Sequence, residues 1–79
     1  MELKDARFLF ESGSLVSAAI TKVPMLTTYH LTVKTQKGKE YPLAGQRSKA
    51  HEAREFKTID AAVANAKKIG FKNVTVILD

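Results

Sequence analysis

Residues 28–36 alternate between apolar and polar side chains, and this period of two is the strongest constraint on the fold. In an extended segment, three apolar side chains would lie on one face: Tyr29, Leu31 and Val33. Three polar side chains would lie on the other face: His30, Thr32 and Lys34. The pattern predicts a half-buried antiparallel strand with a wet, basic outer face.

A tight turn follows this strand, and Gly38 can supply the positive φ that such a turn needs. Residues 40–43 then return with Tyr41 and Leu43 on one face, which completes a β-hairpin. Pro42 has no N–H group to donate, so the returning strand is expected at a sheet edge or to end in a bulge. An edge strand leaves backbone groups open to a partner chain.

Residues 59–69 predict an amphipathic helix. Thr58 is a suitable N-cap because its hydroxyl can accept from a backbone N–H, and Asp60 lies near the positive end of the helix dipole. The apolar stripe has spacings of three and four: Ile59, Ala62, Val63, Ala66 and Ile69. The side chains expected to face water are Asp60, Asn65, Lys67 and Lys68. Gly70 fits the left-handed position after the helix, and Phe71 can fold back on the last turn.

The N-terminal segment has two interpretations. Apolar side chains of residues 2–11 recur at helical spacing, and Ser12, Gly13 and Ser14 then provide a helix stop. Phe8 and Phe10 also alternate, which suits a strand equally well. We expect a short helix here.

Three other segments predict strands. Residues 15–23 form an apolar run that ends at Pro24, and residues 54–57 form a brief extended segment. Residues 73–78 are rich in β-branched side chains and apolar on both faces, as in an interior strand. Residues 44–53 lack both periodicities and predict a polar loop.

These elements predict one α+β domain over residues 1–79, with a small antiparallel or mixed sheet and one main helix packed on one face, in the order (α)ββββαβ. A chain of 79 residues buries a thin core, and without cysteine no disulfide can reinforce it. A homodimer formed by pairing open strand edges would compensate. If the strand at 15–23 is apolar on both faces, such pairing would bury Leu15, Val16 or Ile20.

Positive charge is concentrated in the middle of the chain. The net charge is +5, and residues 31–58 contribute most of it through seven Lys or Arg against three Glu. The seven basic residues are Lys34, Lys37, Lys39, Arg47, Lys49, Arg54 and Lys57. Basic side chains at irregular spacing can neutralise backbone phosphates, so this set predicts a nucleic-acid-binding site, with DNA as the favoured partner. The alternative is that the same charges only solvate a hairpin.

Aromatic side chains beside these charges could stack with bases, and the candidates are Tyr29 and Tyr41. Their alternation with leucine instead favours packing of both in the core. His30 and His51 are expected at the surface rather than as catalytic bases, and no phosphate-binding glycine loop is present. We therefore expect no enzyme activity, no cofactor, no metal and no small-molecule substrate.

The predicted location follows from the N-terminus and from cysteine usage. The first seven residues mix both signs of charge and lead into no long apolar run, so we expect neither a signal peptide nor a membrane anchor. The absence of cysteine fits a reducing compartment. We expect a cytoplasmic protein with no membrane partner.

Residues 54–62, Arg-Glu-Phe-Lys-Thr-Ile-Asp-Ala-Ala, together with Gly70 and Phe71, resemble a pattern in small partition-associated accessory proteins of bacterial plasmids. The resemblance covers about a quarter of the chain. It implies a non-enzymatic role near DNA in plasmid or mobile-element maintenance, and it assigns no binding residue.

The leading hypothesis is a small nucleic-acid-associated accessory protein that binds phosphates through its basic hairpin and loop. The alternative is a protein-interaction or assembly module that uses an open strand edge and binds no nucleic acid.

Overall fold

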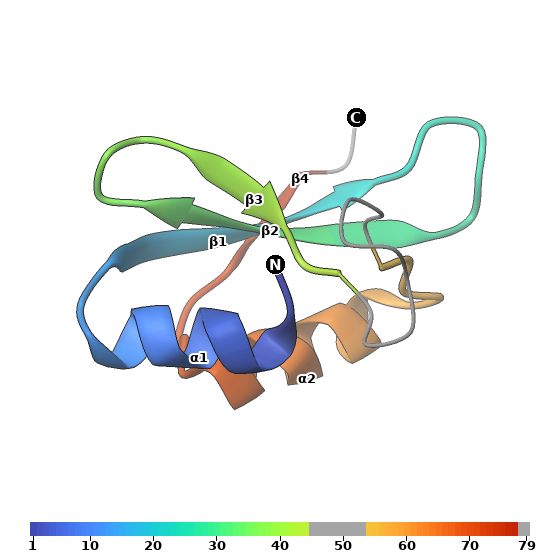
Figure 1. Cartoon of the computed structure of the whole chain (residues 1–79). Helices are drawn as coiled ribbons and strands as arrows, with labels where there is room; N and C mark the ends of the chain where they lie inside the picture. Colours follow the sequence, from blue (N-terminus) through green and yellow to red (C-terminus); the bar gives the residue numbers. More distant parts are fainter. Residues whose placement is uncertain (45–53, 78–79) are drawn as a thin grey trace.

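Two helices cover one face of a four-stranded sheet in the computed structural model, which describes residues 1–44 and 54–77 (Figure 1). The helices are α1 (Leu3–Glu11) and α2 (Ile59–Ile69). The strands are β1 (Leu15–Lys22), β2 (Tyr29–Thr35), β3 (Glu40–Pro42) and β4 (Thr75–Ile77). The spatial order β3-β2-β1-β4 makes β3 and β4 the two edges of the sheet.

The sheet is mixed because α2 carries the chain from one edge to the other. β1 pairs antiparallel with β2, and β2 pairs antiparallel with β3. β4 lies parallel to β1, with Ala19 opposite Thr75 and Thr21 opposite Ile77. A parallel neighbour requires a long crossover, and α2 provides it.

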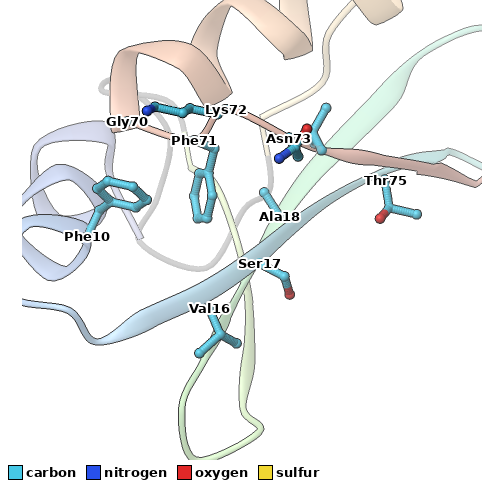
Figure 2. Close-up of a pocket in the computed structure, with 10 residues that line it drawn as sticks. Phe10, Val16, Ser17, Ala18, Gly70, Phe71, Lys72, Asn73 and Thr75 are labelled. Atoms are coloured by element: carbon cyan, nitrogen blue, oxygen red, sulfur yellow. The ribbon is translucent and has the colours of Figure 1, made fainter.

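The end of α2 fixes how the chain enters β4. Gly70 has a φ of +129°, and the N–H groups of both Gly70 and Phe71 donate to the carbonyl of Ala66, which closes the helix. Phe71 then meets Phe10 of α1 in an edge-to-face contact with ring centroids 4.9 Å apart (Figure 2). The Phe10 ring lies directly over Gly70, so a larger residue at position 70 would collide with it.

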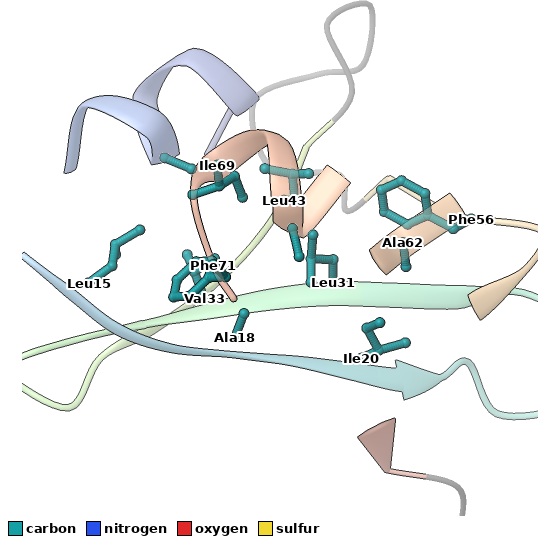
Figure 3. Packing of buried hydrophobic residues seen from close by; sticks show 12 residues of the cluster. Leu15, Ala18, Ile20, Leu31, Val33, Leu43, Phe56, Ala62, Ile69 and Phe71 are labelled. Atoms are coloured by element: carbon teal, nitrogen blue, oxygen red, sulfur yellow. The ribbon is translucent and has the colours of Figure 1, made fainter. Parts of the chain in front are cut away.

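The core lies between the sheet and the helices (Figure 3). Ile20, Leu31, Val33 and Leu43 are its largest fully buried side chains. Ala62 and Ala66 line the inner side of α2, and their small size lets the helix approach the strands closely. α1 adds Ala6 to the same core and contacts both α2 and β1.

Most of the predicted elements are confirmed. The helix at 59–69 has the predicted bounds, and the Thr58 hydroxyl accepts from the N–H of Ala61 at 3.1 Å. The N-terminal segment is a helix, as expected, rather than a strand. The strands at 15–23 and 28–36 form β1 and β2, Gly38 has a φ of +88°, and Pro42 lies on an edge strand. The α+β class with a mixed sheet is therefore correct.

Three expectations about individual segments are wrong. Residues 54–57 form one isolated bridge, between Phe56 and Tyr29, rather than a strand, because the ladder on that side of β2 already belongs to β3. β4 is an exposed edge rather than an interior strand. Asn65 is 8% exposed instead of facing water, because α1 packs against α2 and widens its buried side, and its amide donates to the carbonyl of Ala61 at 3.0 Å.

The edge proposed for dimerisation is also corrected. β1 lies between β2 and β4, so its backbone is not an edge where β4 pairs with it. Leu15 and Ile20 are already buried within one chain, and only Val16 is exposed.

Replacing Gly70 by alanine should destabilise the protein by about 2 kcal/mol, because a Cβ there is strained at positive φ and would lie 2.5 Å from the Phe10 ring. Gly13 is the matched control, since its φ is +80° and a Cβ there meets nothing within 4 Å. Gly13→Ala should cost only about 1 kcal/mol of backbone strain. Thermal unfolding measures both, and equal losses would show that the Phe10 contact is not tight.

Candidate nucleic-acid interface

The sheet face opposite the helices is polar, and we call it the open face. The strand registers place these side chains on it: Ser17, Ala19, Thr21, His30, Thr32, Lys34, Glu40, Pro42, Thr75 and Ile77. The residues between them in β1 and β2, including Ile20, Leu31 and Val33, point into the core. Hydroxyl groups of Ser and Thr can donate to phosphate oxygens, so this face offers neutral donors beside Lys34.

Three of the predicted basic residues belong to the hairpin of β2 and β3. Lys34, Lys37 and Lys39 are all exposed. Lys34 lies on the open face with Glu40 directly across from it, so its charge has an opposite charge nearby. Lys37 and Lys39 lie in the turn, beyond the paired strands.

A cavity of about 350 Å³ lies beside the turn, and we call it the hairpin hollow. Its lining residues are Ser14, Thr35, Gln36, Lys37, Lys39 and Tyr41. Backbone hydrogen bonds connect the residues that line it. The N–H of Gln36 donates to the carbonyl of Ser14 at 3.0 Å, and the N–H of Thr35 donates to the carbonyl of Lys39 at 2.8 Å. The Gln36 side-chain amide also donates to the carbonyl of Gly13. The hollow is thus lined by two lysines, a tyrosine and the two aliphatic hydroxyl residues Ser14 and Thr35.

The other predicted basic residues do not join this cluster. Arg54 and Lys57 flank Phe56, which pairs with Tyr29 at the opposite end of β2 from the turn. Six residue steps separate Tyr29 from Thr35, or about 20 Å along a strand. The guanidinium of Arg54 lies 4.9 Å from the centre of the Phe56 ring, so part of its role is structural. Arg47 and Lys49 lie outside the described residues.

Tyr41 is more exposed than the sequence predicted. It shares the inner face with Val33, as the alternation predicts, but it is 36% exposed because β3 has a neighbouring strand on one side only. Tyr29 is half-buried and packs against the core. The signal for Tyr41 was present in Pro42, which already placed its strand at an edge.

A second groove, of about 490 Å³, lies where the start of β1 faces the segment between α2 and β4 (Figure 2). Phe10, Ala18 and Phe71 give it an apolar lining, and Lys72 is the only charged residue that lines it within the part of the chain that the structure describes. This composition does not suit a polyanion.

Two classes of site receive no support within residues 1–44 and 54–77. No three His, Asp or Glu side chains there gather closely enough to hold a metal ion. Neither helix in that part of the chain has the length and apolar content needed to cross a bilayer.

Comparison with known proteins found no matching family model, no similar curated protein and no similar solved structure. The likeness to plasmid accessory proteins stays a prediction.

Arg54→Gln should lower the free energy of unfolding by about 0.5 kcal/mol, because the substitution removes the cation from the Phe56 ring. Lys57→Gln is the control, since it removes the same charge from an exposed neighbouring position. Urea denaturation of both variants measures the difference. Equal stabilities would mean that the stacked guanidinium contributes nothing.

Proposed function

We propose that this protein binds nucleic acid through the phosphate backbone, with the β2–β3 hairpin as the principal contact. The observation that carries the proposal is the exposure of Lys37 and Lys39 in the turn between β2 and β3, beyond the paired strands and at the end of β2 that carries Lys34. Each phosphate neutralised by a lysine releases condensed counterions, which favours binding without base specificity. The protein would act as a cytoplasmic accessory factor rather than an enzyme, and the resemblance to partition-associated proteins supports a role in plasmid maintenance with DNA as the ligand.

Arg54 and Lys57 would take part only if the ligand extends about 20 Å along β2. Along the axis of duplex DNA each strand presents a phosphate every 3.4 Å or so, and a bound duplex segment of about six base pairs would reach both ends. Arg47 and Lys49 belong to the proposed set on the basis of their charge and position in the sequence.

The double substitution K37Q/K39Q should weaken binding and lower the slope of log affinity against log salt by about 2, because two phosphate contacts are lost. K67Q/K68Q is the matched control, as it removes the same charge from two exposed lysines in the last turn of α2. Fluorescence anisotropy with labelled single-stranded and duplex DNA between about 50 and 200 mM salt measures affinity and slope.

Equal losses of affinity in K37Q/K39Q and K67Q/K68Q would mean that binding depends on net charge rather than on the hairpin. Absence of binding to any DNA or RNA at low salt would remove the proposal altogether and leave the assembly module.

A second function, self-association through β4, is favoured by the unequal protection of the two sheet edges. The β3 edge carries Glu40 and Pro42, which discourage pairing with another strand. Residues 73–77 carry no charge and no proline, and Val76 and Ile77 are 38% and 45% exposed. Antiparallel pairing of β4 with the β4 of a second copy would satisfy the free backbone groups and cover these side chains.

Sedimentation equilibrium should therefore show a dimer of the 8.7 kDa chain, and Val76→Lys should make it monomeric by placing like charges together at the twofold axis. Met25→Lys is the control, since Met25 is fully exposed and lies in the β1–β2 loop, outside the strands of the sheet. A monomer at every micromolar concentration would disprove self-association.

A further inference from the structure

The hairpin hollow carries a more specific assignment, which rests on the proposed nucleic-acid function. We infer that it binds one nucleotide of a single-stranded nucleic acid, with the base stacked on Tyr41 and the phosphate held by Lys37 and Lys39. Its volume of about 350 Å³ lies near the lower end of the range for small-molecule sites. A unit of nucleotide size suits such a space, whereas the bases of an intact duplex are stacked on each other and out of reach.

Tyr41 is available for stacking because of its place in the sheet. The register puts it beside Val33, on the inner face, but it belongs to the outermost strand and keeps over a third of its surface exposed. Stacking on an aromatic ring is tolerant of base identity, since every base has a π-face. The ring would therefore add affinity for single strands without adding sequence specificity.

The acidic residue of the hairpin does not cancel the charge of the hollow. Successive side chains of an extended strand point to opposite faces, so Lys39 and Tyr41 line the hollow while Glu40 lies on the open face opposite Lys34. No Asp or Glu lines the hollow among the residues that the structure describes. Within the described lining, an anionic phosphate would thus meet two ammonium groups and no carboxylate.

The hydroxyls of Thr35 and Ser14, which both line the hollow, have complementary hydrogen-bonding roles. Thr35 Oγ1 accepts from the N–H of Lys39 at 3.3 Å, which leaves its O–H free to donate to a phosphate oxygen. Ser12 donates its hydroxyl to the carbonyl of Leu9 at 3.0 Å, so in the 3.1 Å contact between Ser12 and Ser14 the donor is Ser14. The lone pairs of Ser14 then remain to accept from an N–H group of the base.

The test compares a single-stranded oligonucleotide of about 12 residues with a duplex of the same length and with a free mononucleotide. Tyr41→Ala should weaken single-strand binding about tenfold, with the salt slope unchanged because no phosphate contact is lost. Tyr41→Phe should stay within about twofold of the original protein, since the π-face is kept. Phe8→Ala is the matched control, because Phe8 is a 70% exposed aromatic residue on α1. Duplex binding should be the same in all variants.

Tyr41→Leu keeps an apolar side chain without a π-face, and it replaces Tyr41→Ala if the latter fails to fold. The inference is overturned if the leucine or alanine variant binds single strands as tightly as the original protein, or if it loses single-strand and duplex binding equally. Binding of the mononucleotide as tightly as the oligonucleotide would also overturn it, in favour of a small-molecule site. In the first two cases, a loss of affinity in K37Q/K39Q leaves the proposed function standing, whereas absence of all binding removes both.

Discussion

The complete burial of Leu31 and Val33 beneath the helices is the constraint on which the rest of the structure depends. Because side chains alternate along a strand, this burial fixes which residues of β2 face away from the core. A slip of one residue would bring His30, Thr32 and Lys34 into the core, where an unpaired ammonium group is very costly. The packing of Leu31 and Val33 against the helices therefore holds the helices in place and determines which side chains lie on the open face. It also sets the start of the turn that carries Lys37 and Lys39.

The sequence predicted the elements whose signals are local. Thr58 and Gly70 mark both ends of α2, and each acts through backbone groups within four residues of itself. The edge position of β3 followed from Pro42 in the same way. Strand neighbours and helix contacts depend on residues far apart in the chain, which explains why the predictions for β4 and for Asn65 were wrong. The apolar β4 resembles an interior strand until its place beside β1 is known, and the burial of Asn65 depends on α1.

The candidate site was predictable as a charge distribution but not as a surface. Seven basic residues within 28 positions suggested one patch, yet the described members lie at both ends of β2 because Phe56, between Arg54 and Lys57 in the sequence, pairs with Tyr29 at the start of that strand. Arg54 is partly committed to the Phe56 ring, and Lys34 faces Glu40. Lys37 and Lys39 neither stack on the Phe56 ring nor lie opposite Glu40, because the turn that carries them extends beyond the paired residues of β2 and β3. Ser14, which is distant in sequence, also lines the hollow beside them, and its carbonyl accepts from the N–H of Gln36.

The two proposed functions use opposite edges of one sheet and so do not compete. β3 and β4 are separated by β2 and β1, which amounts to about 14 Å at normal strand spacing. Pairing at β4 would leave the hairpin and its hollow accessible in both copies. It would also join two weak phosphate-binding sites in one particle, and the second contact with the same nucleic acid would then be intramolecular. Two lysines on a turn would give limited affinity at physiological salt, so in the proposed function the protein would gain more from a second copy of its hairpin than from any single added charge.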